Sequence, residues 1–266
     1  MQQAGRIQKM ATELGSPIQY WMRLDDERVP MNDLIGSELT LRYQGRITCT
    51  ICGRKTKKSY NQGFCYPCMI SAPEASECII KPELCRGHEG GGRDAEWEQK
   101  YHVQPHYVYL AVSSAVKVGV TREPQVPTRW IDQGASHAIK LAKLPNRYLA
   151  GTLEVALKQH FTDRTNWRKM LKNEVLEDVD LVQVKHDLLD KLSDEHRSYV
   201  VDDHAVTTLH YPVDAYPTKV TSVGFDKLPE ITGKLMGIKG QYLLLSENRV
   251  LNVRKHTAYH IQLEAH

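Results

Sequence analysis

The most regular pattern of apolar and polar positions lies in residues 107–161. Two short apolar runs, at 107–112 and 116–121, are separated by a turn of small residues, and such a pair of runs predicts two strands. "SHAIKLAKL", which begins at Ser136, predicts a third strand. The middle of the chain is therefore expected to contain three strands.

Two helices are predicted within the same stretch. The first is opened by Pro127, because the fixed φ of proline suits a first helical position, and it ends near Gly134. The second lies in "RYLAGTLEVALKQHF", where four-residue spacing of large apolar side chains indicates an amphipathic helix. These side chains are Leu149, Leu153, Leu157 and Phe161.

The two ends of the chain also contain strand patterns. "SELTLRYQGRI" places Leu39, Leu41 and Tyr43 at alternate positions, and from Ile231 onward short apolar runs are separated by glycine and asparagine. We expect the N- and C-terminal strands to pair, since pairing would cover an exposed sheet edge. Residues 1–16 are expected to form a short helix or a loose end.

Residues 174–203 are strongly acidic. They contain ten Asp or Glu and three Lys or Arg. The pattern predicts a solvated surface helix, which is also a candidate contact for a protein partner.

Composition sets broad limits. The 266 residues have a formal net charge of +3, with 41% hydrophobic and 25% charged residues, which is ordinary for a globular protein. No apolar run is long enough to span a membrane, and the first residues do not resemble a secretory signal. We therefore expect a cytoplasmic protein, in which six cysteines favour metal ligands over disulfides. Nothing in the sequence indicates its oligomeric state.

Four cysteines have the spacing of a zinc knuckle. "CTICGRKTKKSYNQGFCYPC" has the pattern C-x2-C-x12-C-x2-C, in which each pair binds one ion from a tight turn. The predicted ligands of this structural zinc are Cys49, Cys52, Cys65 and Cys68.

The knuckle is also basic. Between Leu39 and Pro73 there is no Asp or Glu, and tyrosines and a phenylalanine are interleaved with cations. Such a surface suits phosphate contact and base stacking, so nucleic acid is the expected partner, with DNA and RNA left open. The candidate contacts are Arg42, Arg46, Arg54, Lys55, Lys57 and Lys58. A basic surface that only keeps the protein in solution is the alternative.

A second zinc site is a further expectation. "SECIIKPELCRGHEGG" supplies Cys78, Cys85 and His88, and the fourth ligand would be His102 or His106. The alternative is a set of buried thiols and surface histidines.

Residues 107–167 resemble the GIY-YIG nuclease superfamily. "YVY" at 107–109 is similar to its first motif, "KVG" at 117–119 to its second, and "TNWRKML" to the closing segment of its phage-type branch. In this chain Tyr107 replaces the first glycine of the first motif, and Lys117 replaces the tyrosine of the second. The overall layout, with its zinc ribbon and "RWIDQGA", also resembles an uncharacterised bacterial family of unknown function.

The resemblance implies an active site for phosphodiester cleavage. Arg129 falls where the superfamily has an arginine, and Glu154 falls where it has a metal-binding glutamate. Glu154 would hold one Mg²⁺ or Mn²⁺, and Arg129 or Arg122 would hold the phosphate. Tyr107, Tyr109 or Lys117 would orient or deprotonate the attacking water.

The expected fold class is α+β. A small antiparallel three-stranded GIY-YIG-like sheet flanked by helices is joined to a zinc ribbon and a β-rich module from both ends of the chain. The expected segments are 1–48, 49–106, 107–172, 173–204 and 205–266, in the order N-terminal β segment, zinc-binding region, core, acidic helix and C-terminal β segment. The expected function is a metal-dependent nuclease (a hydrolase). A non-catalytic nucleic-acid-binding module and a zinc-stabilised protein-interaction scaffold are the alternatives.

Overall fold

The computed structural model describes residues 1–161 and 166–266, and it is a mixed α+β protein with several sheets. The chain forms two compact units. The first, here called unit 1, comprises residues 1–70, 131–134 and 209–266, and unit 2 comprises residues 71–130 and 135–208. Thr165, the first residue of "TNWRKML", lies outside the described residues.

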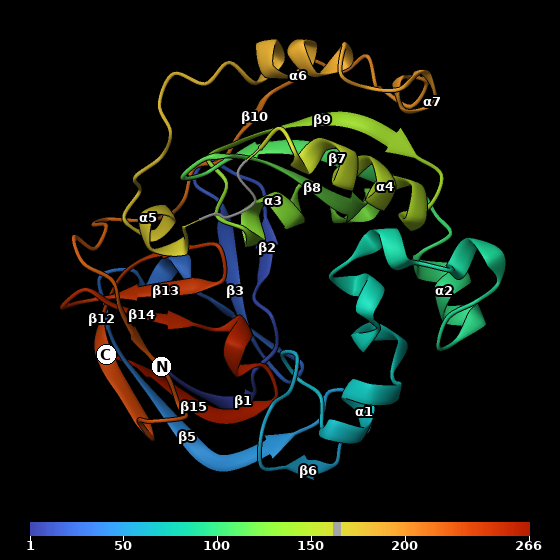
Figure 1. Ribbon diagram of the computed structural model, residues 1–266. Helices are drawn as coiled ribbons and strands as arrows, with labels where there is room; N and C mark the ends of the chain where they lie inside the picture. The colour runs from blue at the N-terminus through green and yellow to red at the C-terminus, as the bar shows by residue number, and fades with distance from the viewer. Residues whose placement is uncertain (162–165) are drawn as a thin grey trace. The chain divides into compact units, whose positions relative to one another are not determined.

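Unit 2 is built on a four-stranded antiparallel sheet of order β10-β9-β7-β8. Its strands are β7 (His106–Val112), β8 (Val116–Arg122), β9 (His137–Leu144) and β10 (Thr207–Thr208). Helix α3 (Thr128–Asp132) lies between β8 and β9 in sequence, and α4 (Arg147–Lys158) follows β9. The predicted order of strand, strand, helix, strand and helix is therefore confirmed (Figure 1).

The apolar stripe of α4 is buried in the core of unit 2. Leu153 and Leu157 belong to one cluster with Val108 and Leu110 of β7. Asn146 begins the helix, because its side chain accepts a hydrogen bond from the backbone N–H of Leu149. This packing fixes α4 on the sheet.

The acidic segment does not form a fully solvated helix, which corrects the expectation. Helix α6 (Leu181–Leu189) is followed by the short α7 (Asp194–Arg197). Leu181 and Leu188 of α6 are buried in the same core as α4. Asp187, the acidic residue within α6, is exposed, and most of the other acidic residues of the segment lie exposed outside the helix.

Short elements complete unit 2. They are η2 (Pro73–Ala75), η3 (Glu77–Ile79), η4 (Pro82–Leu84), η5 (Gly87–Glu89), α2 (Ala95–Tyr101), η6 (Glu123–Gln125) and α5 (Trp167–Leu171).

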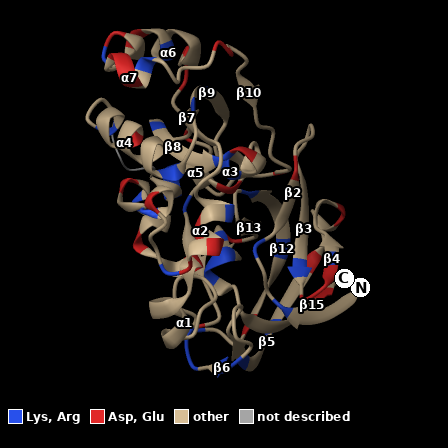
Figure 2. Cartoon of the chain, turned by 90° about the vertical axis from the view of Figure 1, so that its right-hand side faces the viewer, with Lys and Arg blue, Asp and Glu red and all other residues tan. Residues whose placement is uncertain are grey.

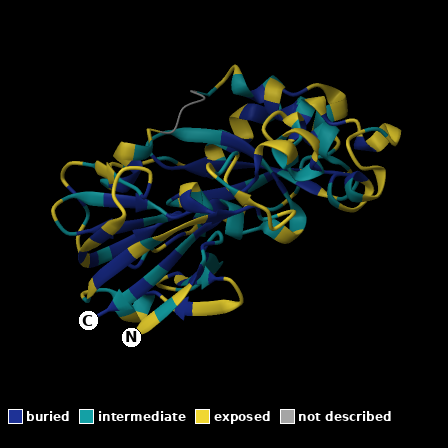
Figure 3. Ribbon diagram, turned by 90° about the horizontal axis from the view of Figure 1, so that it is seen from below, coloured by how far each residue is buried: buried dark blue, intermediate teal, exposed yellow. Residues whose placement is uncertain are grey.

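Unit 1 contains an eight-stranded sheet of order β1-β15-β5-β12-β13-β14-β11, in which β6 also pairs with β5. The strands are β1 (Gln2–Arg6), β5 (Glu38–Thr48), β6 (Lys55–Thr56), β11 (Thr221–Val223), β12 (Glu230–Lys239), β13 (Tyr242–Leu245), β14 (Arg249–Asn252) and β15 (Tyr259–Ala265). Figure 3 shows long buried stretches on these strands.

The two ends of the chain pair within this sheet, as expected. β5 lies between β12 and β15, and β1 pairs with β15. The prediction of a helix or loose end at 1–16 is wrong, because these residues form β1 and β2 (Ala11–Glu13).

A second sheet in unit 1 has the order β2-β3-β4, with β3 (Gln19–Leu24) and β4 (Glu27–Pro30). The remaining short elements of the chain are α1 (Tyr66–Ser71), η1 (Asn32–Leu34) and η7 (Arg254–His256). Among the described residues, no helix combines the length and apolar character needed to cross a membrane.

Candidate functional site

The four knuckle cysteines converge in unit 1. β5 leads directly into Cys49, and the ligand atoms of all four cysteines lie within 4.8 Å of one another. The Sγ atoms of Cys52 and Cys65 are 3.7 Å apart. Zn–S bonds of about 2.3 Å in a tetrahedron place sulfurs about 3.8 Å apart. The cluster is therefore compatible with structural zinc.

The backbone around Cys49 favours the thiolate form of this residue. Gly53 has φ of 69° and donates its N–H to the Cys49 carbonyl, which closes the tight turn between the first two ligands. Burial alone would raise the pKa of Cys49, but hydrogen bonds from the backbone N–H groups of Cys52, Cys65 and Ile51 lower it to about 6. A thiolate at neutral pH is the form that binds metal.

The loop between the two cysteine pairs exposes its cations. Arg54, Lys55, Lys57 and Lys58 are all exposed, and among the described residues none of them forms an ion pair. The turn around β6 is a basic stretch of ribbon in Figure 2. We call these four residues the basic loop.

Aromatic side chains accompany the basic loop. Tyr66 is 55% exposed and packs edge-on against Tyr60, with ring centroids 5.6 Å apart. The ammonium of Lys58 lies 5.2 Å from the Tyr60 ring centroid. Phe64, by contrast, is buried, and Tyr43 packs against Tyr259.

Arg42 is engaged elsewhere. Its guanidinium pairs with Glu230 at 2.5 Å and with Glu264 at 2.9 Å, so it is not a free phosphate contact like the basic loop. Arg46 is exposed and makes no ion pair within the described part of the chain.

A second cluster of metal-ligating side chains lies in unit 2. It consists of Cys78, Cys85, Glu98 and His102, all buried, with ligand atoms within 4.8 Å of one another. Glu98 thus takes the place that the sequence reasoning gave to His88. The missed signal was the spacing of Glu98 and His102, which are four residues apart at the end of α2 and so share one face.

The two other histidines have different surroundings. The ring of His88 stacks on Tyr148 with centroids 4.5 Å apart. His106 is buried on β7, where its Nδ1 bonds the Gln104 carbonyl and its Nε2 has no hydrogen-bond partner. Burial lowers the pKa of His106 to about 3, so its ring is neutral at physiological pH.

Tyr109 and Gly119 form a tight pair across β7 and β8. They are register partners, and a Cβ at position 119 would lie 2.6 Å from the Tyr109 hydroxyl. The Tyr109 ring packs edge-on against Trp130, and the residue is fully buried. Tyr109 is therefore placed as a core residue, and the glycine of "KVG" is explained by its ring.

Tyr107 lies nearer to solvent. Its hydroxyl donates to the Glu123 carboxylate at 3.2 Å, and the ammonium groups of Lys140 and Lys143 lie 5.3 and 5.6 Å from its ring centroid. The hydroxyl is thus already committed to a carboxylate.

Four half-buried cations gather in unit 2. Lys117, Arg122 and Arg129 were predicted, and Arg147, the first residue of α4, was not. Burial and then the charge of Arg129 lower the pKa of Lys117 to about 8. The charge of Arg129 also contributes to lowering the pKa of Arg147. The charges of Arg147 and Arg122 contribute to lowering the pKa of His106. Within the described residues none of the four forms an ion pair.

Glu154 lies on α4 and is 8% exposed. Burial is the main reason that its pKa is raised, and Lys158 opposes this from 3.7 Å. Glu83 of η4 raises the pKa of Glu154 further, and its own Oε2 is buried without a hydrogen-bond partner. The positive charge of Arg147 lowers the pKa of Glu154. Two carboxylates and one arginine therefore lie close together.

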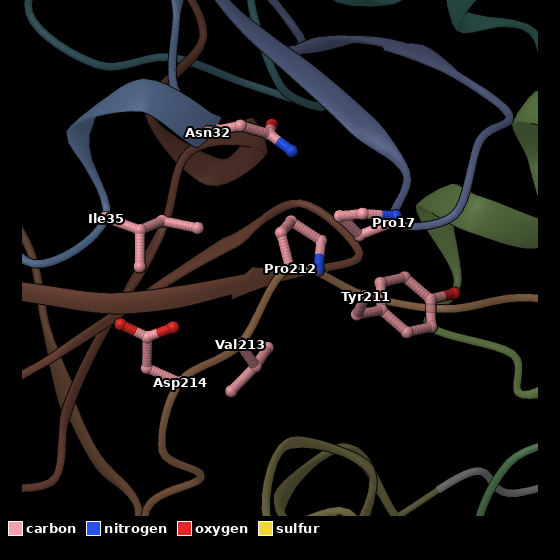
Figure 4. A pocket seen from close by; sticks show the side chains of 7 residues that line it. All are labelled: Pro17, Asn32, Ile35, Tyr211, Pro212, Val213 and Asp214. Carbon is pink, nitrogen blue, oxygen red and sulfur yellow. The ribbon is translucent and has the colours of Figure 1, made fainter.

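A pocket in unit 1 contains none of the predicted site residues. Its volume is about 490 Å³, and its lining, shown in Figure 4, is Pro17, Asn32, Ile35, Tyr211, Pro212, Val213 and Asp214. The Asn32 amide is already bonded to the backbone of Ile18 and Tyr20. The pocket offers few polar groups that could orient a ligand.

Fold and site together define an α+β protein with two clusters of metal-ligating side chains and a group of half-buried cations in unit 2. A family model matches residues 36–261, and the chain belongs to that family, described as "Protein of unknown function (DUF2797)". No curated protein and no solved structure matches the chain.

Proposed function

We propose that this protein binds nucleic acid through its zinc knuckle and cleaves phosphodiesters in unit 2 with one divalent metal ion. The observation that carries the proposal is the group of half-buried cations, Lys117, Arg122, Arg129 and Arg147, which has no carboxylate ion-pair partner among the described residues. Like charges crowded in a desolvated place are costly unless an anion joins them. Phosphate is an anion that arginine binds in two-pronged geometry.

Glu154 and Glu83 are the candidate ligands of the metal ion. Glu154 is buried, and so is the Oε2 atom of Glu83, which has no hydrogen-bond partner and is the kind of donor that Mg²⁺ or Mn²⁺ accepts. A bound divalent ion would neutralise charge on the phosphate. Arg122 and Arg129 would hold the phosphate oxygens.

Lys117 is the candidate general base. Tyr109 is buried against Trp130, and the hydroxyl of Tyr107 is bonded to Glu123. Lys117 has a pKa of about 8, so an appreciable fraction is neutral near physiological pH and able to take a proton from water.

The GIY-YIG resemblance supports the same reaction class. The motif residues Tyr109 and Gly119 are register partners on β7 and β8, which explains why both residue types occur together. The strand order β9-β7-β8 and the helix after each of β8 and β9 agree with the small antiparallel sheet that the resemblance implies.

A cleavage assay tests the proposal. Single-stranded, branched and duplex DNA and RNA are incubated with the full chain and Mg²⁺ or Mn²⁺. We expect cleavage that is lost in Glu154→Gln and in Arg129→Gln but kept in Glu177→Gln, which changes an exposed glutamate of the same unit. Cleavage that is equal in wild type and Glu154→Gln, or absent on every substrate, contradicts the catalytic proposal.

Binding without cleavage is the second candidate. The ion pair of Glu154 with Lys158 favours binding without cleavage, because Lys158 already neutralises the carboxylate that would hold the metal ion. In that case fluorescence anisotropy shows nucleic-acid binding that Glu154→Gln leaves unchanged, and no substrate is cut. Binding that is also absent would leave a zinc-stabilised scaffold for protein partners.

A further inference from the structure

We propose that Cys78, Cys85, Glu98 and His102 bind one zinc ion, and that this centre holds η4 against helix α4. The donor set is two thiolates, one imidazole and one carboxylate, all of them common zinc ligands. The proposal does not depend on catalysis at Glu154.

Three of the distances between the donor atoms are close to those around one tetrahedral ion. His102 Nδ1 lies 3.8 Å from Cys78 Sγ and 3.5 Å from Cys85 Sγ, and Cys85 Sγ lies 4.0 Å from Glu98 Oε2. Zn–S of about 2.3 Å and Zn–N of about 2.1 Å at the tetrahedral angle give an S···N separation of about 3.6 Å. Glu98 Oε2 and His102 Nδ1 are in direct hydrogen-bond contact, so these two side chains must move apart when both bind the ion.

Burial makes the site a closed one. Cys85, Glu98 and His102 are each 2% exposed, and Cys78 is 7% exposed. Several groups able to ionise are thus removed from water together, which is costly unless a cation joins them. A zinc ion supplies two positive charges, and four protein ligands leave no open position for substrate. We therefore assign the centre a structural role.

Groups around the donors complete the centre. The Ser76 hydroxyl lies 3.2 Å from Cys78 Sγ and can donate to the thiolate. With two thiolates and a carboxylate the zinc site has a net charge of −1, and the guanidinium of Arg147, which is bonded to the Cys78 and Ile79 carbonyls, compensates it. Such outer partners orient metal ligands and adjust the charge of the site.

The centre ties together elements that have little apolar surface of their own. Cys78 lies on η3, Cys85 directly follows η4, Glu98 lies on α2 and His102 directly follows α2. Arg147 of α4 donates from Nε to the Cys78 carbonyl at 2.9 Å and from Nη2 to the Ile79 carbonyl at 2.8 Å. One ion thereby secures the turns that contact the first half of α4.

Zinc stoichiometry tests the proposal. The full chain, purified under reducing conditions, is analysed by mass spectrometry for bound metal. We expect two zinc ions per chain in wild type, one in the Cys49→Ser, Cys52→Ser double variant, and one in the Cys78→Ser, Cys85→Ser double variant. One zinc per chain in wild type, lost only with the knuckle cysteines, overturns the second centre.

Single substitutions test the donor set even where a double variant does not fold. Glu98→Gln keeps the size of the side chain and is expected to release one zinc to a chelator at least tenfold faster than wild type. His88→Ala and Glu96→Gln serve as matched controls and are expected to keep both ions. Faster release in His88→Ala but not in Glu98→Gln, or a Cys78–Cys85 disulfide in peptide mapping of the reduced-purified protein, contradicts the assignment.

Discussion

Gly151 of α4 lies directly against the backbone of Glu83. A Cβ built at position 151 would be 2.2 Å from the Glu83 nitrogen and 2.4 Å from the Pro82 carbonyl carbon. The glycine therefore allows η4 to contact the helix along its backbone. The same turn presents the Glu83 carboxylate to Glu154, which lies one helical turn after Gly151.

Replacing Gly151 with Ala is expected to destabilise the protein by about 1–3 kcal/mol, because the methyl group meets backbone atoms that cannot rotate away. This is the reverse of the usual effect in a helix, where Ala is about 1 kcal/mol more favourable than Gly. Urea denaturation measures the change. Val155→Ala, at an exposed position of the same helix, is the control and should change the free energy of unfolding by less than about 0.5 kcal/mol. Equal or greater stability of Gly151→Ala contradicts the close contact.

The rate of cleavage is expected to rise with pH through the pKa of Lys117, which is lowered to about 8. Only the neutral amine can accept a proton, and its fraction grows about tenfold between pH 7 and pH 9 for a group with that pKa. Initial rates on the best substrate measure the profile. Lys117→Arg should abolish the rise, since arginine stays protonated throughout this range. A rate that falls above pH 8 would instead assign Lys117 a role as a cation.

Removing the four charges of the basic loop is expected to weaken nucleic-acid binding and its dependence on salt. Each phosphate contact contributes about 0.7–0.9 to the slope of log K against log salt concentration, so four lost contacts reduce the slope by about 3. Anisotropy titrations at several salt concentrations compare the Arg54, Lys55, Lys57, Lys58→Gln variant with wild type.

A matched variant separates local contact from net charge. Arg28, Lys219, Lys227 and Lys234 are also exposed and lie in unit 1, and their replacement by Gln removes the same number of charges. If both variants lose the same amount of affinity, the basic loop is not a specific contact.

Lys185→Met is expected to destabilise unit 2 by about 2–4 kcal/mol. The Lys185 ammonium is buried and donates to the carbonyls of Lys140 at 3.1 Å, Val201 at 2.7 Å and Asp203 at 2.8 Å. Methionine fills the space but leaves three carbonyls without donors, each costing about 1 kcal/mol or more. Thermal or urea unfolding measures the loss. Lys191→Met, at an exposed position, should be close to neutral.

Local patterns predicted the centre of unit 2 well. The strands and helices of residues 106–158 depend on alternation, helical spacing and caps such as Asn146, all of which lie within a few residues of one another. The knuckle could be predicted for the same reason, since its four cysteines are close in sequence. They are Cys49, Cys52, Cys65 and Cys68.

Features that depend on distant partners were not predictable in this way. Residues 2–6 form a strand only because β15 supplies hydrogen bonds from residues 260–264. Glu98 and Arg147 are ordinary helical residues in sequence, and only the return of η3 and η4 toward α2 and α4 brings them beside the thiolates. Tyr109 was expected to face substrate, whereas Trp130 and the space left by Gly119 enclose it.

The pairing of β5 with β12 and β15 also has a consequence for synthesis on the ribosome. β5 ends at Thr48, and its partners begin at Glu230 and Tyr259. β1 and β5 must therefore wait for nearly the whole chain to be translated, while residues 71–208 are synthesised before any of these partners. Unit 2 is thus able to fold first, and during that delay the unpaired strands of unit 1 are the part of the nascent chain most exposed to aggregation.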